Sequence, residues 1–361
     1  MDETTDIKKK KLLVDLSALK DVYCGLGQVA LNYGRHFMEN AKTIYADYQV
    51  VLLVPKDFFG KFGNEVEYIS SSSWLRKHCR FLFPKVDVWH AVHQLCRFKP
   101  AYKQTKFLLT IHDLNYLYEK SGYELTKRQR RIKRKIQRAD KIICISEFAK
   151  SEVEKHHDLT GKDYSVILNG VDNLEQQLAQ KPKTTIKQPF FFSIGVIKQK
   201  KNFHVLLDLM KIIPEKHLYL AGKNNTKYGD AIVQRIENDN ITNVHLLGTI
   251  SQEEKVWLLK NCEAFLFPSL FEGFGLPVIE AMQFGKPVFS SDKTSLKEIG
   301  GKFAYFWENF EPNDMKKMID DNLDNHLKNE ELQEKEKEYA VSFSYEKHFE
   351  EYEKIYRELS R

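Results

Sequence analysis

The chain has 361 residues, more than one hydrophobic core usually supports, so two domains are expected. Its 42% hydrophobic and 29% charged residues are ordinary for a globular protein, and no apolar run approaches the roughly 18 residues of a membrane-spanning helix. The polar N-terminus, MDETTDIKKKK, does not resemble a secretory signal, and five scattered cysteines without a CxxC motif indicate reduced thiols. These features favour a cytoplasmic protein.

The net charge of +6 is distributed unevenly along the chain. Residues 1–172 hold 30 lysines and arginines against 21 aspartates and glutamates, a net charge of +9, which leaves −3 for the rest. The first half is therefore the half expected to meet an anionic surface or ligand.

Short apolar runs alternate with amphipathic stretches through the first half, a pattern typical of an α/β fold with a parallel sheet. Several runs are continuously apolar, as in parallel strands that are covered on both faces. The predicted strands are 11–17, 49–54, 66–70, 87–91, 106–111, 141–145 and 165–168, and the clearest predicted helices are 28–40 and 125–138.

The alternation breaks at 173–188, a polar stretch with few apolar residues that we interpret as a linker. It then resumes with predicted strands 190–194, 217–221, 244–247, 264–267 and 287–290 and predicted helices 203–212, 230–238, 252–260 and 276–284. We therefore predict two doubly wound domains, 1–172 and 189–340, with a ligand cleft between them. The C-terminal helix, 341–361, has an aromatic face that must pack on another surface, and the first domain is the candidate.

The segment 267–285, FPSLFEGFGLPVIEAMQFG, carries the strongest functional signal. A strand ends at Phe267, a loop with two glycines follows, and a helix begins near Leu276 with Pro277 in its first turn. Amide groups near Phe274, Gly275 and Leu276 then face outward at a helix start, where the helix dipole favours an anion such as a diphosphate.

Two glutamates accompany this loop and helix. Glu280 lies one turn into the helix, where its carboxylate can accept hydrogen bonds from a vicinal diol such as a ribose. Glu272 lies in the loop, where it can accept hydrogen bonds from hydroxyls of a second sugar ring. The alternative is a helix N-terminus with surface glutamates, and the agreement of loop, proline and both acids argues against it.

The pair Glu272 and Glu280, seven residues apart within S-L-F-E-G-F-G-L-P-V-I-E-A-M-x-x-G-x-P-V, resembles the EX7E motif of retaining GT-B glycosyltransferases. The segment is most similar to family 4 (glycosyltransferase group 1), which includes bacterial mannosyl- and glucosyltransferases of polysaccharide synthesis. The resemblance implies two Rossmann-like domains, a nucleotide-sugar donor, and retaining transfer of mannose or another hexose. It also implies a glycan or lipid-linked acceptor in lipopolysaccharide, O-antigen or capsule synthesis, and no metal or other cofactor. Glu280 would then hold the nucleotide ribose, and Glu272 would contact the donor sugar.

Two cations fall where the family binds the donor diphosphate. Gly195 follows a strand, and Lys200, Lys201 and Asn202 follow it before a helix. Positive charge there suits a diphosphate leaving group, whose negative charge grows as the sugar bond breaks. The family usually has Arg-Lys at these positions, so a bidentate contact is lost at Lys200 and Lys201 is the stronger candidate. The alternative is a pair of surface lysines at a helix start.

The first half offers two further loops at strand ends. Gly25 and Gly27 open a helix, and their loop resembles the family loop that borders the diphosphate and the acceptor. The alternative there is an ordinary strand–helix turn. His112 and Asp113 end another strand; by resemblance, His112 approaches the donor sugar and Asp113 handles the acceptor. His90, also at a strand end, is expected to be structural or to lie at the cleft edge.

The resemblance also indicates the mechanism. Retention of the anomeric configuration by double displacement would need a carboxylate nucleophile beneath the sugar. The sequence contains no clear candidate for this nucleophile. The resemblance instead implies a front-face substitution in which the leaving diphosphate helps to take the acceptor's proton. The catalytic candidates are His112, Lys201 and Glu272.

The run 127–138, KRQRRIKRKIQR, has eight cations in twelve positions and no acid. Such a helix binds anionic lipid headgroups or nucleic acid, or it is only a solvated cationic face. Because lipid-linked acceptors lie in membranes, we favour peripheral attachment to the cytoplasmic leaflet and expect no nucleic acid.

Two alternative functions remain open. One is another GT-B enzyme, such as a nucleotide-sugar epimerase or a phosphorylase, although the cofactor lysine signal of a phosphorylase is absent. The other is a non-catalytic nucleic-acid-binding protein that uses 127–138, although no recognition module is visible. The full fingerprint of an NAD-dependent oxidoreductase, G-x-G-x-x-G with an acid about twenty residues further on, is also absent.

Overall fold

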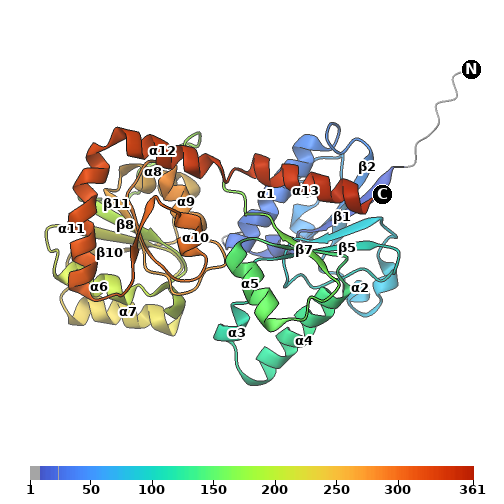
Figure 1. Ribbon diagram of the computed structural model, residues 1–361, viewed down its shortest axis with the longest axis horizontal. Helices are drawn as coiled ribbons and strands as arrows, with labels where there is room; N and C mark the ends of the chain where they lie inside the picture. Colours follow the sequence, from blue (N-terminus) through green and yellow to red (C-terminus); the bar gives the residue numbers. More distant parts are fainter. Residues whose placement is uncertain (1–8, 23) are drawn as a thin grey trace, which may run out of the picture. The chain divides into compact units, whose positions relative to one another are not determined.

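The computed structural model describes residues 9–22 and 24–361, which fall into two units (Figure 1). Unit 1 comprises the chain up to Leu168 together with His348–Arg361, and unit 2 comprises Asn169–Lys347. Each unit contains one all-parallel sheet with helices on both faces, which confirms the predicted α/β class. The segment 173–188, expected to be a linker, belongs to unit 2, where Leu174 is buried and its amide donates to Gln283 Oε1 at 2.8 Å.

The seven strands of unit 1 have the order β3-β2-β1-β4-β5-β6-β7. From β1 the chain adds strands β2 and β3 on one side and then strands β4 to β7 on the other. The strand order therefore reverses between β1 and β4, and doubly wound sheets bind ligands at such a point. The predicted strands agree with the observed ones within two residues at each end. They are β1 (Lys10–Asp15), β2 (Tyr48–Val54), β3 (Glu67–Ser70), β4 (Val88–Ala91), β5 (Lys106–Ile111), β6 (Lys141–Cys144) and β7 (Asp163–Val166).

The helices of unit 1 cover both faces of this sheet (Figure 1). Ser146 caps α5, because its hydroxyl accepts a hydrogen bond from the amide of Ala149. The helical segments are η1 (Ser17–Lys20), α1 (Gly25–Asn40), η2 (Lys56–Phe58), α2 (Trp74–His78), η3 (Arg80–Leu82), α3 (Tyr116–Glu119), α4 (Gly122–Arg138) and α5 (Glu147–His156).

The C-terminal helix, α13 (Tyr345–Leu359), packs its aromatic face into unit 1 from His348 onward. Three buried hydrogen bonds tie it there, and they join Tyr33 to His348 (3.0 Å), His90 to Tyr356 (2.8 Å) and Thr110 to Tyr352 (2.7 Å). His90 is therefore a structural residue of the unit 1 core, where its two ring nitrogens bind Tyr356 and Thr110.

The six strands of unit 2 have the order β10-β9-β8-β11-β12-β13. They are β8 (Phe190–Ile194), β9 (His217–Ala221), β10 (Val244–Gly248), β11 (Ala264–Phe267), β12 (Val288–Ser291) and β13 (Ala304–Trp307). The helical segments are η4 (Gln199–Lys201), α6 (His204–Lys211), α7 (Lys227–Asn238), α8 (Gln252–Asn261), α9 (Leu276–Met282), α10 (Leu296–Gly300), α11 (Pro312–Lys328) and α12 (Glu330–Val341). Within residues 9–22 and 24–361, none of the helices has the length and apolar character to span a bilayer.

Candidate functional site

Lys201 and Glu272 form an ion pair in unit 2. Lys201 ends η4, which follows β8, and Glu272 lies in the loop after β11. Because β8 and β11 are parallel neighbours, both loops leave the same edge of the sheet. Lys201 Nζ lies 2.6 Å from Glu272 Oε1, and the Ser269 hydroxyl donates to the same oxygen at 2.6 Å. The side chains of Lys201 and Glu272 are only 13% and 15% exposed, so water screens the pair weakly.

Glu272 is ionised in this environment. Burial alone would raise the pKa of Glu272, but the charges of Lys201 and Lys200 and the hydrogen bonds from Lys201 and Ser269 outweigh burial and lower it. The Lys201 ammonium also lies 4.7 Å from the centroid of the Phe267 ring, within the range of a cation–π contact. The site therefore presents a fixed anion and a fixed cation side by side, which suits binding of sugar hydroxyls and of phosphate, respectively.

The conformation of the backbone around Lys201 explains why Gly195 precedes it and why Asn202 follows it. A Cβ at Gly195, whose φ is 154°, would lie 2.9 Å from Lys201 Cε. Asn202 has a left-handed backbone (φ 58°) and a buried side chain, and it ends the η4 turn. The Lys200 carbonyl accepts a hydrogen bond from the Leu270 amide at 2.7 Å, which ties η4 to the loop after β11.

The loop after β11 is held by the segment that follows β12. The Ser295 hydroxyl donates to the carbonyls of Glu272 (3.0 Å) and Phe274 (2.7 Å). The Glu272 amide donates to Thr294 Oγ1 at 3.1 Å. The Phe274 ring is buried, so this residue can offer a ligand its backbone but little of its side chain. The sequence analysis did not identify Thr294 or Ser295.

Helix α9 begins at Leu276, as predicted, with Pro277 in its first turn. Gly275 has φ 118°, and a Cβ there would lie 2.7 Å from Leu296 Cδ2, so both backbone conformation and space require glycine. Pro277 has no N–H and the Val278 amide donates to the Gly275 carbonyl at 2.9 Å, so the amides near Phe274, Gly275 and Leu276 are the ones that this end of α9 can offer to an anion.

Glu280 pairs with a lysine that the sequence analysis missed. Lys255 of α8 places Nζ 2.7 Å from Glu280 Oε1, and both side chains are 14% exposed. The ion pair fixes the orientation of the carboxylate. The two glutamates of the motif are thus each matched to a different lysine, one on η4 and one on α8.

His112 lies at the end of β5 in unit 1 and is buried. Its amide donates to Gln94 Oε1 at 3.0 Å, and its Nε2 lies 2.9 Å from the Val92 carbonyl oxygen. Burial lowers the pKa of His112 to about 4, so the ring is neutral at physiological pH. Since Nε2 must carry the hydrogen that Val92 accepts, Nδ1 is the acceptor nitrogen.

Gln94 also fastens Asp113, and the sequence analysis missed this residue too. Gln94 Nε2 donates to the Asp113 carbonyl at 2.7 Å, and the Asn115 amide donates to Asp113 Oδ1 at 3.0 Å. Gln94 is buried after β4, so one amide side chain fixes the backbone of both His112 and Asp113.

The glycine loop near the start of α1 has a structural explanation at one position. A Cβ at Gly27 would lie 1.9 Å from the Asp21 carbonyl oxygen, so the close approach of two backbone segments requires glycine. A Cβ at Gly25, the first residue of α1, would meet nothing within 4 Å. The predicted site residues therefore form two sets, with Gly25, Gly27, His112 and Asp113 in unit 1 and the rest in unit 2. Within the part of the chain that the structure describes, no three His, Cys, Asp or Glu side chains are placed to hold a metal ion.

Two families of known proteins match consecutive parts of the chain. Residues 29–173 match the family described as "Glycosyltransferase Family 4", and residues 175–342 match "Glycosyl transferases group 1". The serotype-specific mannosyltransferase WbdA of Escherichia coli is 29% identical over 199 residues, which cover 50% of this chain but 23% of WbdA. The O-antigen chain mannosyltransferase RfbU of Salmonella typhimurium is 24% identical over 310 residues, which cover 80% of this chain and 84% of RfbU.

Solved structures share the fold over nearly the whole chain. Sucrose-phosphate synthase from Thermosynechococcus elongatus superposes with a TM-score of 0.74 at 17% identity and covers 97% of this chain and 99% of its own. Anabaena Alr3699/HepE in complex with UDP and glucose gives a TM-score of 0.72 at 16% identity, covering 96% and 99%. At these identities the likeness establishes the fold, and the predicted GT-B architecture is confirmed.

Proposed function

Because this chain belongs to the glycosyltransferases of group 1 and family 4, we propose that it transfers a hexose from a nucleotide-sugar to a glycan or lipid-linked acceptor in cell-surface polysaccharide synthesis. The names of the relatives WbdA and RfbU support mannose as the sugar. Structures of Alr3699/HepE with UDP and with UDP-glucose support testing uridine donors beside guanosine donors.

The observation that carries this proposal is the pairing of both motif glutamates with lysines at the carboxyl edge of the unit 2 sheet. In the proposed complex Glu280 accepts the ribose hydroxyls, and Glu272, kept ionised by its surroundings, accepts hydroxyls of the donor sugar. The first turn of α9, Lys201 and Lys200 receive the diphosphate.

The proposed reaction retains the configuration of the anomeric carbon. The bond from that carbon to the diphosphate oxygen breaks, and the diphosphate leaves with the electron pair. The acceptor hydroxyl gives its proton to the leaving diphosphate, and its oxygen bonds to the same face of the sugar. Lys201 stabilises the charge that grows on the diphosphate, and neutral His112 offers hydrogen bonding without an added charge. No metal ion or other cofactor is needed in this scheme.

Peripheral attachment to an anionic membrane on its cytoplasmic side is part of the proposal. It is supported by the eight cations of 127–138 on α4 and by Trp74 and Phe81 of the same unit, which are each 68% exposed. Aromatic side chains and cations are the groups that favour a membrane interface. The purified protein should float with anionic vesicles at low salt. Protein that stays separate from the vesicles would contradict the proposed membrane attachment.

Donor turnover tests the site directly. Release of nucleoside diphosphate from GDP-mannose, UDP-glucose and ADP-glucose can be measured for the wild type, Glu272→Ala and Lys201→Ala. Each substitution should lower turnover by about a hundredfold, because Lys201 stabilises the charge that develops on the diphosphate and Glu272 positions the donor sugar. Lys198→Ala is the matched control, because Lys198 is an exposed lysine that precedes the same η4 turn. Near wild-type turnover in both site variants, with the fold intact, would remove the assignment.

A further inference from the structure

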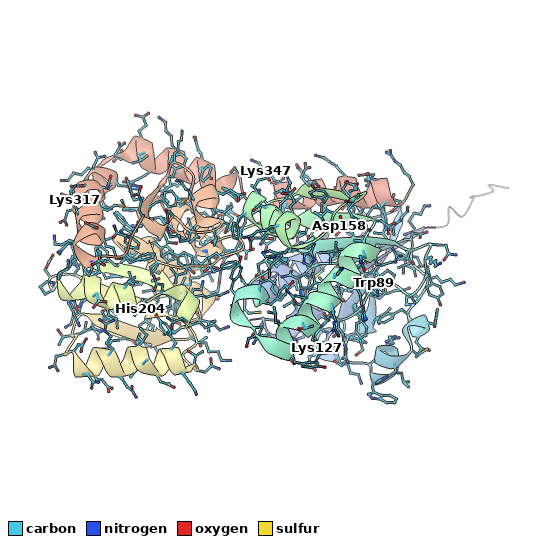
Figure 2. All side chains as sticks on the ribbon, turned by 60° about the horizontal axis from the view of Figure 1, so that its bottom comes forward. Trp89, Lys127, Asp158, His204, Lys317 and Lys347 are labelled. Atoms are coloured by element: carbon cyan, nitrogen blue, oxygen red, sulfur yellow. The ribbon has the colours of Figure 1, made fainter. Side chains whose placement is uncertain are left out.

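One face of α4 lines a cavity of about 640 Å³ in unit 1. The lining residues on α4 recur at helical spacing and so form one stripe, and the 97–99 segment supplies the remaining two. Seven of the nine lining residues are cations, and none of the nine is acidic; they are Arg97, Lys99, Tyr123, Thr126, Lys127, Arg130, Arg131, Arg134 and Lys135. Figure 2 labels Lys127 on this helix.

Two of these cations are fixed in the wall of the cavity. Lys135 is 2% exposed, and its Nζ donates to the carbonyl oxygens of Gln94 (3.0 Å) and Cys96. Arg131 Nη2 donates to the carbonyls of Leu95 (2.9 Å) and Cys96 (2.7 Å). These bonds hold α4 against the 94–96 segment and fix two of the cations that line the cavity.

Arg130, Arg134 and Lys127 have exposed side chains on the cavity face, where a ligand can reach their charged groups. Arg130 and Arg134 are exposed and lie one helical turn apart on the cavity face. Lys127 has an exposed ion pair with Glu124 at 3.7 Å, which is a weak competitor for its charge. Because these like charges repel one another, an anion of charge −2 or more in the cavity would relieve the repulsion. Guanidinium groups bind phosphate oxygens in bidentate geometry, which favours phosphate over a simple halide.

We infer that this cavity is a second binding site, which receives a phosphomonoester or diphosphate group and is separate from the nucleotide-sugar site of unit 2. Its volume lies in the range of small-molecule sites and exceeds that of one phosphate, so the phosphate belongs to a larger ligand. The group can come from a soluble molecule or from a lipid headgroup, since both present the same oxygens. The inference rests on the same helix as the proposed membrane attachment and deepens it by naming the group that is bound and the residues that bind it, and it does not depend on the donor site of unit 2.

Inorganic pyrophosphate is the first probe. Since pyrophosphate should also bind the donor site, calorimetric titrations use the Lys201→Ala chain as background. In that background Arg130→Gln/Arg134→Gln should weaken binding about tenfold or more, because two charge-assisted contacts are lost. Arg128→Gln/Lys133→Gln removes the same charge from the same helix but from residues outside the cavity, and should weaken binding less than about threefold.

Vesicles separate the two sources of the phosphate. Flotation is measured with phosphatidylcholine vesicles that contain phosphatidic acid, with and without pyrophosphate as competitor. The cavity pair is Arg130→Gln/Arg134→Gln, and the control pair is Arg128→Gln/Lys133→Gln. If the phosphate comes from a lipid, the cavity pair should no longer float with the vesicles, the control pair should still float, and pyrophosphate should compete with the vesicles. If the phosphate comes from a soluble molecule, both pairs should float equally, while the cavity pair should still bind pyrophosphate more weakly than the control pair.

The inference is overturned if the Lys201→Ala chain does not bind pyrophosphate, or if both pairs weaken every form of binding equally. Equal weakening would show a general cationic surface without a site. Nucleotide-sugar binding, measured in parallel on chains with Lys201 intact, should be unchanged by the cavity pair, so failure here and failure of the donor site can be told apart. Arg128 is half-buried and the other three replaced side chains are exposed, and urea unfolding midpoints that match the wild type would show that both variants fold.

Discussion

Replacing Lys201 with methionine removes the cation that keeps Glu272 ionised within unit 2. The two groups are 2.6 Å apart, and their side chains are 13% and 15% exposed. Removing one partner of a buried ion pair typically costs about 3–5 kcal/mol, because the other charge stays buried without compensation. The Ser269 hydroxyl would still donate to Glu272 at 2.6 Å. We therefore expect a loss of about 3 kcal/mol at pH 7, at the low end of that range.

The pH dependence of this loss has a definite sign. In the wild type the folded pKa of Glu272 lies below its ordinary value of 4.5, so its contribution to stability is present above 4.5 and is lost as the pH falls through the folded pKa. Without Lys201 less opposes burial, so the pKa of Glu272 rises and the folded state loses stability relative to the wild type as the pH rises and the carboxyl ionises. The difference between the two proteins should therefore be largest at neutral pH and should shrink below pH 4.

The assay is hydrogen exchange of β8 and β11 amides in a urea series at pH 7 and pH 4, which reports on unit 2 by itself. Wild type, Lys201→Met, Glu272→Gln and the double variant form a cycle, and the double variant should lose less than the sum of the single losses. Lys198→Met, an exposed neighbour, should stay within about 0.5 kcal/mol of the wild type. A Lys201→Met loss below about 0.5 kcal/mol at pH 7, or one that does not depend on pH, would refute the reasoning.

Three further changes test other parts of the structure. Burial lowers the pKa of His112 from 6.5 to about 4, so as the pH falls between these values unfolded His112 takes up a proton and folded His112 does not. His112 alone should therefore cost unit 1 up to about 1.4 kcal/mol per pH unit, in addition to the contributions of His36, His90, His93 and His348, whose pKa values are also lowered by burial. His112→Gln should remove that one-proton slope from urea unfolding measured across this range. Gly195→Ala places a methyl 2.9 Å from Lys201 Cε, so it should lower donor turnover by about tenfold or more while costing about 1–3 kcal/mol in thermal unfolding. Tyr356→Phe leaves His90 Nδ1 buried without its 2.8 Å partner and should cost about 1–3 kcal/mol in urea unfolding of unit 1.

Each of these results has a counterpart that would contradict it. An unchanged slope between pH 4 and 6.5 in His112→Gln would mean that His112 is protonated in the folded chain. Wild-type turnover in Gly195→Ala would mean that the position of Lys201 does not matter. A stability loss below about 0.5 kcal/mol in Tyr356→Phe would mean that His90 finds another partner.

The fold was predictable wherever a strand is a continuous apolar run with polar ends. Strands β8, β9, β11 and β5 begin and end at the predicted residues, because parallel strands buried on both faces carry their signal in the local sequence. The start of α9 was predictable for a similar reason, since Gly275 and Pro277 mark a helix start within three residues.

The partners of the site residues were not predictable, because they come from distant parts of the chain. Lys255 is 25 residues from Glu280, and Gln94 is 18 residues from His112, and neither lies in a motif of its own. Surface lysines and glutamines are common, so only tertiary structure distinguishes these two from the rest. The need for glycine at position 27 was not predictable for the same reason. It comes from the close approach of the Asp21 carbonyl, which no sequence pattern indicates.

Thermal denaturation with a panel of GDP-, UDP- and ADP-sugars tests most directly whether the segment 267–285 builds a donor site. A ligand at a hundred times its dissociation constant should stabilise the chain by about 2.7 kcal/mol. We predict that one nucleotide class raises the melting temperature, that Glu280→Ala loses the effect, and that Lys198→Ala keeps it. Stabilisation that persists in Glu280→Ala, or no stabilisation by any of the three classes, would contradict the donor site.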